Sequence, residues 1–179
     1  MNNTKKTKET EMDPGKKKDK YRIIGPLYDF LSNLYSGRSI HHCKIAMINK
    51  DNIKKGDRVL FAGVGHGLDA IQAAELGANV TVVDLSETML NQFRQNLKKQ
   101  NKKLKIRQVH SDILEFNEFQ KYDMVVANFF LNVFYQDMMT RILEQLVRLG
   151  KPGAKIVVGD FSYPSGNIIS RAFKVIYWY

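Results

Sequence analysis

Short apolar runs alternate with helix-like segments through the middle of the sequence, and this alternation most constrains the fold. Strands separated by helices of this length call for a parallel sheet covered by helices on both faces. Ligands in such sheets bind beyond the carboxyl ends of the strands. We therefore predict an α/β, doubly wound, mostly parallel fold. The expected strands are 58–62, 79–83, 104–109, 122–127 and 154–159, and the expected helices are 69–76, 86–100 and 138–149.

The length of 179 residues fits one domain. Residues 1–20 hold seven lysines and four acids, so we predict a disordered Lys-rich tail followed by one folded domain at 21–179. This domain is expected to begin with broken helices within 21–49. The formal charge of +10 permits an anionic partner without requiring one.

Cysteine content and hydropathy indicate the compartment. Cys43 is the single cysteine, which excludes an intrachain disulfide and a Cys-based zinc cluster and fits a reducing environment. The neighbouring pair His41 and His42 does not make a metal site, because adjacent helical residues point about 100° apart. The sequence has no apolar run of bilayer length and no secretory signal, so we expect a cytoplasmic protein without a metal.

A glycine-rich loop follows the first expected strand. Gly63, Gly65 and Gly67 alternate with Val64 and His66, and glycine lets the backbone turn tightly and approach a ligand. This G-x-G-x-G spacing differs from the G-x-G-x-x-G of dinucleotide sites. It suits a nucleoside that carries an amino-acid chain, although a tight turn without a ligand is the simpler alternative.

Three polar positions follow the next three strands. Asp84 lies 21 residues after Gly63, where a carboxylate can accept hydrogen bonds from both ribose hydroxyls. The triplet Ser111-Asp112-Ile113 can meet a nucleobase, or Asp112 can simply cap a turn. Asn128 precedes two phenylalanines that can wall an apolar pocket or pack in the core.

These motifs, in this order and spacing, resemble those of class I S-adenosylmethionine-dependent methyltransferases over about residues 21–179. The chain looks most like the ubiquinone/menaquinone-biosynthesis C-methyltransferases and the related phospholipid methyltransferases. Further similarity lies in Tyr28-Asp29, Asn132-Val133 and the segment 160–164. The family's usual acid on the first strand is Phe61 here, and the quinone enzymes' arginine before the Asn-Val pair is Leu131.

The resemblance implies a Rossmann-like methyltransferase domain that binds S-adenosyl-L-methionine and transfers its methyl group by in-line displacement. The acceptor is expected to be small and apolar or lipid-like, such as a quinol or a phospholipid head group. Tyr28, His66 and Asp160 are the candidate bases, with Asp29 beside them. The expected cofactor-binding residues are Gly63, Val64, Gly65, Gly67, Asp84, Leu85, Ser111, Asp112, Ile113 and Asn128.

Two other functions stay open. A basic run at 98–107 can contact RNA phosphates, but it lacks interleaved aromatic residues, so we favour a small acceptor over nucleic acid. The family's last two strands are not found before Tyr179, so we expect a C-terminally incomplete methyltransferase domain. A non-catalytic cofactor-binding module completed by a partner is the other reading. The apolar, cationic segment 168–179 can contact a membrane or cap the active site, and homo-oligomerisation is left open.

Overall fold

The computed structural model describes residues 44–100 and 104–160. The predictions for the tail 1–20, for Tyr28-Asp29, for His41 to Cys43 and for 161–179 lie outside these residues. The elements are β1 (Arg58–Ala62), α2 (Leu68–Glu75), β2 (Asn79–Asp84), α3 (Glu87–Lys99), β3 (Ile106–His110), β4 (Tyr122–Asn128), the 3-10 turn η1 (Leu131–Val133), α4 (Gln136–Leu149) and β5 (Gly150–Gly159).

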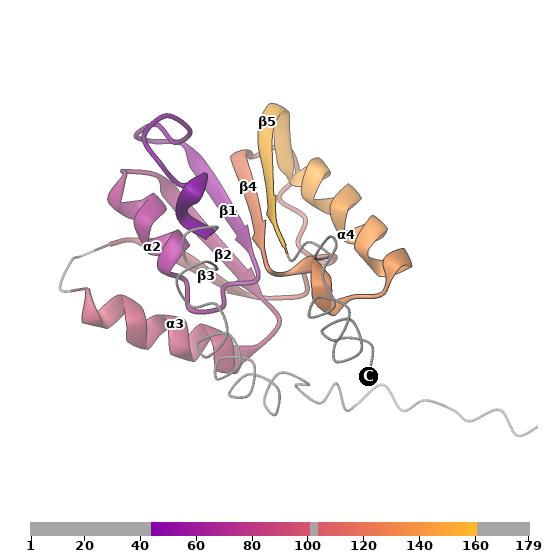
Figure 1. Ribbon diagram of the computed structural model, residues 1–179, viewed down its shortest axis with the longest axis horizontal. Coiled ribbons are helices and arrows are strands. Elements are labelled where there is room, and N and C mark those ends of the chain that lie inside the picture. Colours follow the sequence, from indigo (N-terminus) through magenta and orange to yellow (C-terminus); the bar gives the residue numbers. More distant parts are fainter. Residues whose placement is uncertain (1–43, 101–103, 161–179) are drawn as a thin grey trace, which may run out of the picture.

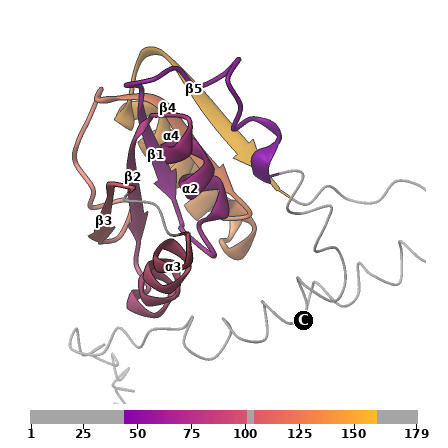
Figure 2. The ribbon, with the colours of Figure 1, turned by 90° about the vertical axis from the view of Figure 1, so that its left-hand side faces the viewer.

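The five described strands form one sheet in the order β3-β2-β1-β4-β5, and every neighbouring pair is parallel. Figures 1 and 2 show β3 and β5 at opposite edges. The chain moves outward from β1 to β3 and then crosses back to β4 on the other side of β1. The strand order therefore reverses between β1 and β4, which is the switch point where open α/β sheets bind ligands. The predicted α/β fold class is confirmed.

Alternating side chains of the strands build two hydrophobic clusters, one on each face of the sheet. On one face Val59 and Phe61 of β1 pack with Ile71 of α2 and Phe93 of α3. On the other face Leu60 packs with residues of α4, including Ile142 and Leu146. Figure 1 shows α2 and α3 together on the left of the sheet and α4 on its right. The helices thus cover both faces, as the alternation predicted.

Most predicted boundaries hold to within two residues, but β5 begins four residues earlier than expected. Gly150 and Pro152 are residues that favour the end of a helix. Gly150 ends α4 in an extended conformation (φ −70°, ψ 147°) and so already pairs with Tyr122 of β4. The pairing shifts register between Tyr122 and Met124. Helix and strand therefore follow each other without an intervening turn.

Candidate active site

The glycine loop leaves the end of β1 through three residues with left-handed backbone angles. Gly63, Gly65 and Gly67 have φ values of 75°, 48° and 68°. The N–H of Gly63 donates to the carbonyl of Val83 at 2.9 Å, and the N–H of Gly67 donates to that of Val64 at 2.8 Å. The loop is thus fixed by its own backbone to β2 and into a tight turn, as the sequence predicted.

The three glycines serve different purposes. A Cβ on Gly63 would lie 2.4 Å from the ring of Phe130, and a Cβ on Gly67 would lie 2.1 Å from the ring of Phe93. Internal packing alone therefore excludes side chains at both positions. Among the described residues, a Cβ on Gly65 would meet only the ammonium of Lys44, at 3.6 Å. Gly65 is the glycine whose backbone is left approachable.

Asp84, at the end of β2, is joined directly to this loop. Its Oδ2 accepts a hydrogen bond from the N–H of Val64 at 2.8 Å, and its Oδ1 accepts one from the N–H of Ser86 at 2.8 Å. Ser86, the first residue of the expected helix 86–100, caps α3 by accepting from the N–H of Met89. Asp84 is therefore not the cap of α3.

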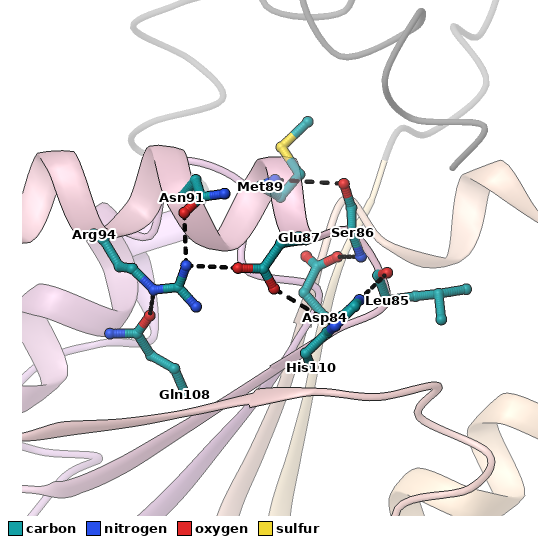
Figure 3. A network of polar contacts seen from close by, with 9 residues as sticks. All are labelled: Asp84, Leu85, Ser86, Glu87, Met89, Asn91, Arg94, Gln108 and His110. Atoms are coloured by element: carbon teal, nitrogen blue, oxygen red, sulfur yellow. Dashed lines mark hydrogen bonds and ion pairs between the residues drawn. The ribbon is translucent and has the colours of Figure 1, made fainter. Parts of the chain in front are cut away.

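A polar network surrounds the strand ends beside Asp84 (Figure 3). The His110 ring contacts the carbonyl of Leu85 at 2.9 Å and lies 3.5 Å from Glu87. Arg94 pairs with Glu87 at 2.7 Å, and this hydrogen bond from Arg94 holds the pKa of Glu87 below its ordinary value. Arg94 also donates to Gln108 at 3.1 Å. The network ties α3 to β3 and positions Leu85, whose side chain is 48% exposed.

The Ser111-Asp112-Ile113 segment follows β3, at the carboxyl ends of the strands, where Asp84 also lies. The N–H of Ser111 donates to the carbonyl of Asp84 at 3.1 Å, which brings the two predicted cofactor-binding segments together. One oxygen of Asp112 accepts from the N–H of Leu114 at 3.0 Å, so Asp112 caps a turn as well. Ile113 is buried in the core beside α4.

Asn128 ends β4 and connects three parts of the chain. Its Nδ2 donates to the carboxylate of Asp69 at 3.0 Å and to the carbonyl of Lys44 at 3.2 Å. Phe129 follows with a left-handed φ of 53°, which is rare for a bulky residue and is characteristic of functional sites. Phe130 packs on Gly63, and its ring contacts that of Phe134 edge to face at 5.3 Å.

The other candidate residues differ in where the structure places them. His66 lies half-buried in the glycine loop, and its carbonyl accepts from Asn96 at 3.1 Å. Asp160 follows Gly159, which pairs with Asn128, so Asp160 lies with the other candidates at the carboxyl ends of the strands. Leu131 is buried in the core and so is not an acceptor contact. Among the described residues no three metal-ligating side chains gather into a site.

Sequence reasoning missed Lys44 and Asp69 as members of this site. Asp69 is in the first turn of α2, and it is only 5% exposed although it is a carboxylate. Its position two residues after Gly67 was a signal, but an acid there is also expected simply to stabilise a helix N-terminus. Lys44 carries no local signal, because only the fold brings it to Gly65.

The five-stranded parallel sheet with helices on both faces defines a Rossmann-like domain. Residues 59–153 match the sequence pattern of the methyltransferase domain family, and the chain belongs to this family. The chain is 27% identical over 164 residues to the demethylmenaquinone methyltransferase of Clavibacter sepedonicus. It is 28% identical over 159 residues to the ubiquinone/menaquinone biosynthesis C-methyltransferase of Pseudomonas aeruginosa.

These alignments cover 90% and 86% of this chain but 64% and 60% of the two relatives. The chain thus spans somewhat less than two thirds of their length.

Solved structures share the fold. The PH0226 protein of Pyrococcus horikoshii has a TM-score of 0.63 and 21% identity, covering 89% of this chain and 68% of that one. The 1,6-didemethyltoxoflavin-N1-methyltransferase of Burkholderia thailandensis has a TM-score of 0.55 and 20% identity, covering 82% and 66%.

Proposed function

We propose that this protein transfers a methyl group from S-adenosylmethionine to a small apolar or lipid-like acceptor. The observation that carries the proposal is the junction between the glycine loop and Asp84. Gly65 offers approachable backbone, and the Asp84 carboxylate is held at the neighbouring strand end by the N–H of Val64, at 2.8 Å. Membership in the methyltransferase domain family supports the same reaction class.

The donor set fits this cofactor. Asp84 supplies a carboxylate that accepts hydrogen bonds from ribose hydroxyls. Leu85 supplies an exposed apolar side chain for the adenine ring, and the backbone N–H groups and the carboxylate of the segment 111–113 supply its polar partners. Gly65 lets the backbone approach the amino-acid chain because no Cβ intervenes. Each group lies at the carboxyl ends of neighbouring strands, where this fold binds ligands.

The cofactor supplies an electrophilic methyl group on a sulfonium. The protein binds and orients the reactants and excludes water from them, which lowers the barrier chiefly by positioning. The side chains of His66 and Asp160 are the described groups that can accept a proton from an acceptor hydroxyl or ring carbon. Tyr28 is the third candidate and lies outside the described residues.

Exposed apolar side chains near the carboxyl ends of the strands support an apolar acceptor. Leu68 begins α2 beside the glycine loop and is 43% exposed, while Val133 and Tyr135 follow β4 and are 47% and 92% exposed. The relatives are named for quinone biosynthesis, which favours a quinol, and a phospholipid head group is the second acceptor class. No helix in the described part of the chain is long and apolar enough to span a bilayer.

A labelling experiment tests the proposal. The purified chain is incubated with methyl-labelled S-adenosylmethionine and, separately, with quinol, phospholipid and RNA fractions. We expect label in the quinol or phospholipid fraction. Label in RNA alone would move the acceptor to nucleic acid, and cofactor binding without transfer would support a non-catalytic module. Failure of the chain to bind S-adenosylhomocysteine would contradict the proposal as a whole.

The glycine variants provide the matched control for this experiment. Gly65→Val places a branched side chain at the approachable position and is expected to abolish labelling. Gly153→Ala changes a glycine with φ 80° and no atom within 4 Å of its Cβ position, at the opposite end of β5. Gly153→Ala therefore tests backbone strain alone and is expected to keep the labelling.

A further inference from the structure

The ring of His110 joins the end of β3 to the residues that begin α3 (Figure 3). Its Nε2 lies 2.9 Å from the carbonyl oxygen of Leu85, and its Nδ1 lies 3.5 Å from a carboxylate oxygen of Glu87. A carbonyl and an ionised carboxylate can only accept hydrogen bonds. The His110 ring therefore spans the turn that carries Leu85, with an acceptor beside each of its two nitrogens.

The protonation state of the ring decides how many of these contacts are favourable. A neutral imidazole has one N–H, so it donates either to Leu85 or to Glu87, and its other nitrogen then turns a lone pair toward the remaining oxygen. An imidazolium has an N–H on both nitrogens and donates to both partners. Histidine is the side chain that makes this change between about pH 5 and 8. Loss of the proton from His110 therefore weakens one of the two contacts.

Charged side chains of the neighbouring elements also act on the ring. Glu87 and Arg94 lie on α3, Asp84 is the register partner of His110 on β2, and Asp112 follows on the segment after β3. Arg94 donates to the second oxygen of Glu87 at 2.7 Å, and this hydrogen bond holds the pKa of Glu87 below its ordinary value. Glu87 therefore stays anionic over the range in which histidine titrates.

The turn that the ring spans belongs to the ligand side of the sheet. Leu85 follows Asp84, the carboxylate proposed above for the ribose, and its side chain is 48% exposed. The ring that contacts its carbonyl comes from β3, and the segment after β3 offers the polar partners of the nucleobase. Movement of this turn would shift the apolar side chain relative to those polar partners.

We infer that His110 is a positioning residue whose protonated ring fixes Leu85 for the nucleobase, so that ligand binding strengthens as the pH falls through the titration of this ring. The inference rests on the proposed function, because the nucleobase belongs to the cofactor proposed above. His110 does not touch the ligand and acts through the turn at 85–87. Coupling between two sites is reciprocal, so ligand binding takes up a fraction of a proton.

Calorimetry with S-adenosylhomocysteine between about pH 5.5 and 8 measures this coupling. His110→Gln can still donate to the Leu85 carbonyl but cannot gain a proton, and any titration of the ligand itself is the same in this variant. Glu87→Gln removes the carboxylate partner. Arg94→Met is the matched control, because it breaks the Arg94 contact with Glu87 and leaves the carboxylate to His110. Buffers of different ionisation enthalpy give the proton uptake, and circular dichroism checks that each variant is folded at each pH.

The two side chains of this pair are 53% and 47% exposed, so the expected effect is that of a partly solvated ion pair. We expect the wild-type affinity to rise about two- to fivefold from the high to the low end of the range, beyond any rise in His110→Gln. Glu87→Gln should lose this rise and Arg94→Met should keep it. Proton uptake should likewise be larger in the wild type than in His110→Gln.

The other outcomes separate the inference from the proposed function. A pH dependence in His110→Gln equal to that of the wild type would overturn the inference, while the proposed function stands. Loss of the rise in Arg94→Met would overturn it as well, because the Glu87 carboxylate is still present in that variant. If the folded wild-type chain binds S-adenosylhomocysteine at no pH, the proposed function fails and this inference fails with it.

Discussion

The two packed glycines of the loop allow a prediction with a worked magnitude. Gly67→Ala places a methyl group 2.1 and 2.4 Å from two ring carbons of Phe93, which is completely buried and cannot turn into solvent. Inserting a methyl into a packed core costs about 1–3 kcal/mol. A left-handed residue other than glycine costs about 1–2 kcal/mol more. We therefore expect Gly67→Ala to lower the free energy of unfolding by about 2–5 kcal/mol.

Urea unfolding followed by circular dichroism measures this change, and Gly153→Ala isolates the backbone part. Gly153 has a φ of 80°, close to the 68° of Gly67, but its Cβ position is open. Gly153→Ala is expected to cost only about 1–2 kcal/mol. In a Phe93→Leu background, Gly67→Ala should cost at least about 1 kcal/mol less than in the wild type. Equal losses for Gly67→Ala and Gly153→Ala would refute the packing explanation.

Three further predictions concern the loop, a hydrogen-bonded carboxylate and a buried amide. Gly65→Ala should weaken S-adenosylhomocysteine binding about tenfold or more while costing only the strain of about 1–2 kcal/mol, measured by calorimetry and urea unfolding. A hydrogen bond from Tyr122 holds the pKa of Glu118 below its ordinary value, so unfolding titrations should show stability falling as pH drops through that pKa and a flatter acid limb in Glu118→Gln. Gln145→Leu removes two hydrogen bonds from a buried amide to backbone carbonyls of the 112–116 turn, and should lower urea stability by about 1–3 kcal/mol or more.

The parts of the fold that depend on local pattern were predictable from the sequence. Short apolar runs and helix-length segments predicted the strands and helices. The expected helix 86–100 begins where the Ser86 side chain caps α3, and such a cap is a local signal. The extended start of β5 was not predictable, because Gly150 and Pro152 favour a turn locally. It is the pairing of Gly150 with Tyr122 that makes this residue part of the strand.

The candidate site shows the same division. The glycine loop and Asp84 were predicted because their spacing along the chain encodes the turn and the strand end. Lys44 was missed because its contact with Asn128 joins residues 84 positions apart, and no local pattern encodes such a contact. The separate roles of the three glycines could not be predicted either, because the G-x-G-x-G spacing is the same whether an aromatic ring or a ligand lies beside each glycine.

The unequal surroundings of the three glycines also bear on how such a sequence changes over evolutionary time. Selection for folding alone maintains Gly63 and Gly67, because Phe130 and Phe93 occupy the space that their side chains would need. At Gly65 folding opposes a side chain only through the strain of its left-handed backbone, so selection for a ligand carries more of the weight there. A descendant that lost its ligand would therefore keep Gly63 and Gly67 and more readily accept substitutions at Gly65. The residue at position 65 then indicates whether the ligand is still bound, and the residues at 63 and 67 indicate that the fold is kept.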